Sequence, residues 1–98
     1  MNVKEVITVL GQNRSRLDEF QVKALYLFGS VVRGEAGPGS DVDILVEFEP
    51  DAHVGLFGFA RLQRFLTERL GRPVDLATSD SLHKAFREGV LKEAVRAA

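Results

Sequence analysis

The sequence predicts a small α/β (α+β) fold, in which a mixed β-sheet is flanked by helices. Ninety-eight residues are enough for a single domain over residues 1–98 with one hydrophobic core. Hydrophobic residues make up 45% and charged residues 28% of the chain, a balance typical of globular proteins. Short apolar segments alternate with longer amphipathic ones, and this alternation indicates one layered sheet.

The first two elements are a helix over residues 2–20 and a strand over residues 24–28. Asn2, with Glu5 three residues later, matches a capping box and favours a helix start. The apolar residues that follow have the three-and-four spacing of one helical face: Val3, Val6, Ile7, Leu10, Leu17 and Phe20. Arg14 interrupts that face. The strand is apolar throughout, as expected of a central strand buried on both faces.

The segment after this strand predicts one helical turn and then a loop. Residues 30–33 can form the turn, with Gly34 ending it, and residues 35–40 (EAGPGS) have the glycine, proline and serine content of a loop. The link between the first two strands is therefore 12 residues long. Such a link permits either strand direction, so the sheet is predicted only as mixed.

Residues 41–48 predict the second strand by their alternation. The apolar residues of one face are Val42, Ile44, Val46 and Phe48. The acidic residues of the other face are Asp41, Asp43 and Glu47, with Leu45 as the exception.

The rest of the chain predicts two helices and a third strand. Residues 56–70 form an amphipathic helix that Gly71 stops, and residues 74–77 form a short strand. The last helix runs to about residue 96, with four candidate caps before it: Thr78, Ser79, Asp80 and Ser81. The apolar positions near its end suggest packing on a second subunit, and hence a homo-oligomer.

Charge and composition exclude several classes of protein. The net charge is −1, so no strong positive field attracts a long nucleic acid. The chain has no cysteine, which excludes disulfides, zinc–thiolate sites and thiol catalysis. No apolar run is long enough for a membrane span, and the N-terminus lacks the features of a signal peptide. We therefore expect a cytoplasmic protein without a membrane partner.

The segment over residues 28–43 carries the chemistry. Gly29 and Ser30 lie where a buried strand meets a helical turn, so that free backbone N–H groups, a hydroxyl and a close backbone approach are available to a phosphate. Arg33 follows one turn later and can bind the same anion. The structural alternative is that each of these residues, taken alone, only shapes a turn.

Three acids follow at positions where they can meet. Asp41 and Asp43 are two apart on a strand and share a face, and Asp75 lies in the third strand. If the second and third strands are neighbours, the three carboxylates converge. At an effective dielectric of about 20, each pair would repel by roughly 2.5–3 kcal/mol. A divalent cation such as Mg²⁺ would relieve that repulsion. The alternatives are a solvated edge strand, and a pair between Asp75 and Arg69 or Arg72.

The combination resembles a known family. Gly29-Ser30, ten residues and Asp41-x-Asp43 are similar to the signature of the polymerase-β-like nucleotidyltransferase superfamily. The surrounding sequence and the spacing to PVDLAT resemble its minimal nucleotidyltransferase (MNT) branch, over about residues 20–95. This resemblance implies the polymerase-β-like nucleotidyltransferase fold.

The resemblance also implies roles for single residues. Four residues would bind the nucleotide: Gly29, Ser30, Arg33 and Ser40. Three would be catalytic and would ligate two Mg²⁺ ions: Asp41, Asp43 and Asp75. The last of these acids would orient or activate the acceptor hydroxyl.

The activity so implied is transfer of a nucleoside monophosphate from ATP or another NTP to a hydroxyl. Members of this branch often accompany a HEPN-domain protein, and MntA-type members act as antitoxins that AMPylate a HEPN ribonuclease toxin on tyrosine. A non-catalytic module that neutralises such a partner by binding is the alternative. A third reading is transfer to RNA or to an antibiotic.

One further cluster is basic. Arg61 and Arg64 are three residues apart and face the same way on the helix over residues 56–70. A solvated helix face and a docking surface for an acidic partner or a nucleic acid are both consistent with this pattern.

Overall fold

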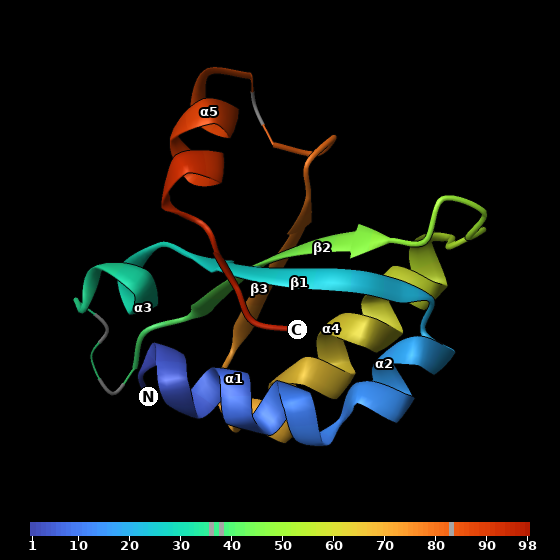
Figure 1. Ribbon diagram of the computed structural model, residues 1–98, viewed down its shortest axis with the longest axis horizontal. Coiled ribbons are helices and arrows are strands. Elements are labelled where there is room, and N and C mark those ends of the chain that lie inside the picture. Colours follow the sequence, from blue (N-terminus) through green and yellow to red (C-terminus); the bar gives the residue numbers. More distant parts are fainter. Residues whose placement is uncertain (36, 38, 83) are drawn as a thin grey trace.

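The computed structural model describes residues 1–35, 37, 39–82 and 84–98 (Figure 1). The helices are α1 (Val3–Gln12), α2 (Arg14–Glu19), α3 (Ser30–Arg33), α4 (Leu56–Leu70) and α5 (Lys84–Glu93). The strands are β1 (Val22–Phe28), β2 (Val42–Phe48), β3 (Val74–Thr78) and β4 (Val95–Arg96). Part of the predicted loop over residues 35–40 lies outside the described residues.

The four strands form one mixed sheet in the order β3-β2-β1-β4. The β1 strand pairs antiparallel with β2 and with β4, whereas β2 and β3 are parallel. This arrangement confirms the predicted mixed sheet. It also makes β2 and β3 neighbours, which was the condition for the acids to converge.

The hydrophobic core lies on one side of the sheet. Figure 1 shows α1, α2 and α4 on that side and α5 on the other. Alternate residues of β1 and β2, among them Leu27 and Ile44, are fully buried against Val6, Leu10 and Leu62 of the helices. The core face is therefore closed by helices, and the acidic residues of β2 and β3 occupy the opposite face.

Several predicted elements are confirmed. The helix over residues 56–70 has the predicted bounds and ends at Gly71, which has the left-handed φ of 68°. The short turn after β1 is present as α3, and Gly34 ends it with a φ of 73°. No helix in the described part of the chain is long and apolar enough to cross a membrane.

The prediction of one helix over residues 2–20 is wrong, because two helices occupy that segment. Asn2 caps α1 as expected, since its side chain accepts a hydrogen bond from Glu5 N–H at 2.9 Å. Asn13 leaves the helical conformation, with φ −111° and ψ 20°. Arg14, the residue that interrupts the apolar face, then donates to the carbonyl of Val22 at 2.7 Å. The break turns α2 toward the start of β1.

The last helix is also shorter than predicted, and a fourth strand follows it. The α5 helix ends at Glu93, and Val95 lies opposite Leu27 in the register between β4 and β1. The β4 strand has two residues, which are too few to show a strand periodicity. The apolar spacing of the sequence therefore predicts a helix as far as residue 96. Ala97, one of the apolar positions assigned to a second subunit, is 5% exposed within this chain.

The candidate caps of the last helix have another role. Thr78 and Ser81 bond to each other through their backbone N–H groups and hydroxyls, at 3.0 and 3.2 Å. They close a turn directly after β3, and α5 begins only at Lys84.

The hydrogen bond from Arg14 to Val22 can be tested for its contribution to stability. We expect Arg14→Ala to lower the free energy of unfolding by about 1 kcal/mol, because the partly buried Val22 carbonyl would lose its donor. Urea denaturation measures the change. Lys4→Ala, on the exposed face of α1, is the control and should change the midpoint little. Equal midpoints for the Arg14 variant and the parent would contradict this role.

Candidate active site

The register of the sheet brings the predicted site residues to one edge. Phe28, the last residue of β1, lies opposite Asp43 in β2, and Asp43 lies opposite Asp75 in β3. Neighbouring strands lie about 4.8 Å apart, so the three positions form a row across the sheet. Gly29 and Ser30 follow directly after Phe28. The sheet thus places the glycine–serine pair beside the two acids.

Gly29 is required by geometry at this position. Its φ of +75° lies in the left-handed region, which side chains rarely adopt. A β-carbon built there would also collide with the carboxylate of Asp43. The Asp43 side chain therefore lies directly against the Gly29 backbone, and a larger residue at position 29 would push it away.

The α3 helix carries the candidate phosphate ligands. Gly29 is its N-cap, and Ser30 is its first residue, half-buried. Arg33 lies in its last turn, where its Nε donates to Glu35 at 3.3 Å. The hydrogen bond that Arg33 donates to Glu35 and the negative charge of Glu93 raise the pKa of Arg33 above its usual value, so the guanidinium stays charged.

Glu93, at the end of α5, is a site residue that the sequence analysis missed. Its Oε1 accepts a hydrogen bond from Gly29 N–H at 2.7 Å and another from Arg33 Nη1 at 3.0 Å. One signal could have found it. A carboxylate in the last turn of a helix faces the negative end of the helix dipole, so it needs a compensating partner.

The carboxylates influence one another electrostatically. The pKa of Asp43 is raised, first by partial burial and then by the charges of Asp75 and Asp41. The Arg33 charge acts in the opposite direction, and the Glu93 charge adds to the increase. Asp41 and Asp75 are exposed. The predicted convergence of the three acids is therefore present, with Asp43 at its centre.

The residues present fit Mg²⁺ as ligands that share it with a substrate. Carboxylate oxygens are the donors that this ion prefers, and it usually keeps waters and substrate phosphates besides one or two carboxylates. Among the described residues, no group of three or more His, Asp or Glu side chains is arranged so that it could hold a metal ion. A bound ion would therefore need further ligands from water and substrate. The mutual repulsion at Asp43 is the observation that favours a cation here.

The structure shows contacts of three residues that the sequence analysis named: Ser40, Arg72 and Arg69. The hydroxyl of Ser40 accepts a hydrogen bond from Gly37 N–H at 2.9 Å, so it closes a turn before Asp41. Arg72 donates to the carbonyl of Gly37 at 3.0 Å and holds the same turn. Arg69 lies over the Phe65 ring, 5.3 Å from its centre. Whether Ser40 also binds a nucleotide stays a prediction.

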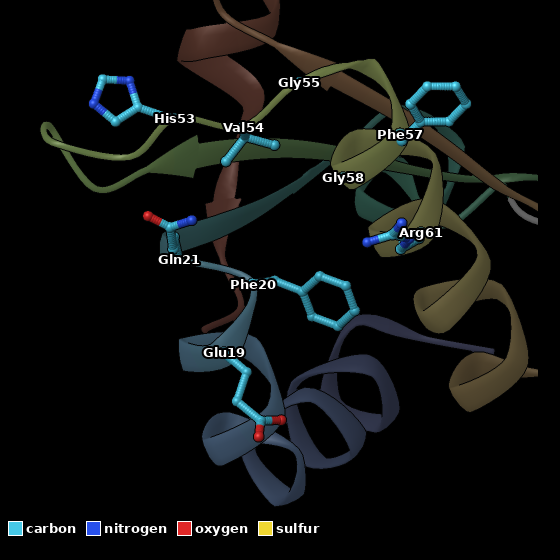
Figure 2. A pocket seen from close by; sticks show the side chains of 9 residues that line it. All are labelled: Glu19, Phe20, Gln21, His53, Val54, Gly55, Phe57, Gly58 and Arg61. Carbon is cyan, nitrogen blue, oxygen red and sulfur yellow. The ribbon is translucent and has the colours of Figure 1, made fainter.

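A separate cleft lies at the other end of β1. Figure 2 shows Phe20 and Gln21 on one side of it and Val54, Phe57 and Arg61 on the other. The cleft has a volume of about 430 Å³. The seven residues of β1 separate Gln21 from Gly29, a distance of about 26 Å at about 3.3 Å per residue. Phe57 is 79% exposed. This cleft includes neither Asp43 nor Asp75, so the carboxylate edge is the candidate active site.

Comparison with known proteins finds similar sequences. The family model described as a nucleotidyltransferase domain matches residues 6–97. The protein adenylyltransferase MntA of Thermococcus cleftensis is 40% identical over 96 residues, which are 97% of this chain and 95% of that relative. A relative from Methanocaldococcus jannaschii is 34% identical over 92 residues, covering 93% of this chain and 92% of its own length.

Solved structures share the fold. A structure described as a minimal nucleotidyltransferase superposes with a TM-score of 0.79 at 35% identity, covering 97% of this chain and 95% of the other. A toxin–antitoxin structure with AMP-PNP gives 0.71 at 22%, covering 100% and 73%. A tri-AMPylated Shewanella oneidensis HEPN toxin in complex with MNT antitoxin gives 0.58 at 19%, covering 90% and 71%. At such identities the last two show the fold alone.

The raised pKa of Asp43 predicts a pH-dependent stability. Folding favours the protonated carboxyl, so ionisation above its folded pKa lowers the free energy of unfolding, and this loss disappears as the pH falls through that pKa. We expect Asp43→Asn to raise the Tm of the metal-free protein at about pH 8, and the gain to vanish near about pH 4. Water screens the half-exposed group, so the gain stays below about 1 kcal/mol.

Thermal unfolding in the presence of a chelator measures this effect. Asp51→Asn, in the exposed loop after β2, is the control and should leave the pH profile unchanged. A lower Tm for Asp43→Asn at high pH would show that the carboxylate stabilises the fold and would contradict the repulsion argument.

Proposed function

We propose a specific reaction for this chain, which belongs to the nucleotidyltransferase domain family and is a nucleotidyltransferase. It transfers AMP from ATP to a hydroxyl group of a partner protein. The observation that carries this proposal is the register that sets Asp43 between Asp75 and the Gly29–Ser30 turn. That arrangement offers groups for a triphosphate and for an acceptor at the same edge of the sheet.

The phosphate end of the site is supplied by α3. We assign the triphosphate to the Ser30 hydroxyl and to the backbone N–H groups that begin the turn, since the first N–H groups of a helix have no acceptor within it. The Gly29 N–H itself is occupied by Glu93, so the contribution of Gly29 is close backbone approach. Arg33 adds a permanent positive charge.

The three acids form the metal and acceptor side. In this proposal Asp41, Asp43 and Asp75 hold two Mg²⁺ ions together with phosphate oxygens and waters. When bound, Mg²⁺ supplies the positive charge that neutralises the triphosphate and the developing pyrophosphate. Asp75 lies opposite Asp43 in the neighbouring strand, so these two face the same side of the sheet, and Asp41 lies directly before β2.

The proposed transfer is a single displacement at the α-phosphorus of ATP. The acceptor oxygen forms a bond to the α-phosphorus of ATP while the bond from that phosphorus to the bridging oxygen breaks. Pyrophosphate leaves with the electron pair, and the hydroxyl proton passes to a carboxylate, which we assign to Asp75. The exposure of Asp75 leaves room for an acceptor carried by another molecule.

We propose a HEPN-domain protein as that partner. The similarity to a protein adenylyltransferase supports a protein acceptor and AMP as the transferred group. The shared fold with an MNT antitoxin in a complex with an AMPylated HEPN toxin supports the class of partner. ATP is plentiful in the cytoplasm, and we place the reaction there.

The experiment incubates the protein with its HEPN partner, α-labelled ATP and Mg²⁺. We expect label on the partner, and loss of more than about 99% of it in the Asp41→Asn, Asp43→Asn double variant, because the metal ligands are gone. The matched control is the Glu49→Gln, Asp51→Asn double variant, which removes the same charge from exposed positions.

Three outcomes are informative. Label that depends on Asp41 and Asp43 but not on the control positions supports the proposal. Tight complex formation without label, unaffected by the double variant, would overturn it in favour of a module that acts by binding. Label on RNA or on a small molecule instead of the partner would overturn the assigned acceptor.

A further inference from the structure

Glu93 joins two parts of the site that are remote in sequence. Its carboxylate accepts three hydrogen bonds: from Gly29 N–H at 2.7 Å, and from Arg33 Nη1 at 3.0 Å to one oxygen and 3.2 Å to the other. The partners are 64 and 60 residues away along the chain. The Glu93 side chain is 28% exposed and that of Arg33 is 48% exposed. The contact therefore lies at the margin of the site, partly sheltered from water.

The sheet determines where Glu93 lies. In the antiparallel pair of β1 and β4, Tyr26 lies opposite Arg96 and Leu27 lies opposite Val95. Continuing this register by two residues sets Glu93 beside Gly29. The short β4 strand thus positions a side chain of α5 at the edge that carries the candidate active site.

The position of Glu93 is electrostatically unfavourable in two respects. Its charge adds to those that raise the pKa of Asp43, at an edge that already has three carboxylates. It also lies at the negative end of the α5 helix dipole. These two unfavourable interactions must be offset by favourable ones, and the hydrogen bonds from Gly29 and Arg33 supply them.

The contacts leave one arm of Arg33 available. Glu35 binds Nε at 3.3 Å and Glu93 binds Nη1, so two carboxylates fix the plane of the guanidinium. Across the described ranges of the chain, Nη2 makes no hydrogen bond to a protein group. A guanidinium whose plane is fixed in this way can offer the Nη2 hydrogens to an anion at little cost in side-chain entropy.

We propose that Glu93 is a positioning residue for nucleotide binding. It orients Arg33 and the Gly29 peptide, and acts on the triphosphate only through them. This inference rests on the proposed function, because it takes the nucleotide to bind at α3.

The test measures the Kd of the Mg²⁺–ATP complex, and kcat and KM for transfer, in the intact protein. We expect Glu93→Gln to weaken nucleotide binding about tenfold, since charge-assisted bonds become neutral ones. Glu93→Asp should recover part of that loss at an unchanged Tm. Glu88→Gln, exposed on the same helix, is the matched control and should bind ATP as the parent does.

A double-variant cycle separates positioning from a merely structural role. If Glu93 acts through Arg33, Glu93→Gln should weaken binding only about twofold further in an Arg33→Ala background. If the two substitutions instead weaken binding independently, so that their fold-changes in Kd multiply, the proposal is overturned. A tighter Kd in Glu93→Gln would also overturn it, because the carboxylate would then compete with the phosphates.

The same measurements distinguish failure of the proposed function from failure of the role of Glu93. A parent protein that neither binds Mg²⁺–ATP nor transfers label would refute both proposals. A parent that does both, with Glu93→Gln indistinguishable from it, would refute only the role of Glu93.

Discussion

Repulsion between carboxylates at one edge of the sheet is the interaction around which the structure is arranged. Asp43 is held between Asp75 on the neighbouring strand and Asp41 two residues before it, and its pKa is raised first by partial burial and then by these two charges. The strands cannot move apart to relieve this, because their other face is the hydrophobic core. Fully buried residues such as Ile44 and Leu27 fix the strands that carry the acids. The core thus maintains a charge arrangement that is unfavourable by itself.

The cationic side of the site is small by comparison. Arg33 lowers the pKa of Asp43, but its guanidinium is shared with Glu35 and Glu93. The chain therefore leaves a deficit of positive charge where the acids meet. In the proposed function, a substrate that arrives with divalent ions would supply what is missing, and the site would recognise the metal complex of a nucleotide better than the nucleotide alone. The open arrangement of the acids has the same consequence, because ligands from the substrate would be needed to complete the coordination of an ion.

Much of this could be predicted from the sequence, and the exceptions have physical reasons. The alternation in residues 41–48 predicted that Asp43 and Glu47 share a face, and the burial along β2 confirms it. Asp41, predicted on the same face, lies directly before the strand. The break at Asn13 depends on a contact between Arg14 and Val22, which helical periodicity cannot reveal. The β4 strand is too short to have a period, and its position depends on the free edge of β1. Glu93 was missed for the same reason, since only that pairing brings it to Gly29.

The parallel register of β2 and β3 also disfavours a misfolded state in which β3 pairs with β2 one residue out of register. Side chains alternate along β3, so a slip by one residue would turn Asp75 toward the core and expose Val74 and Leu76, which are 4% and 7% exposed in the native pairing. The mispaired sheet would lose apolar burial and would have to desolvate a charge. Asp75 therefore disfavours the shifted register and helps to specify the native pairing of β2 and β3. Chains that reach the native energy minimum are the same chains that present Asp75 to a substrate, so a stable but inactive misregistered population has no basis to accumulate.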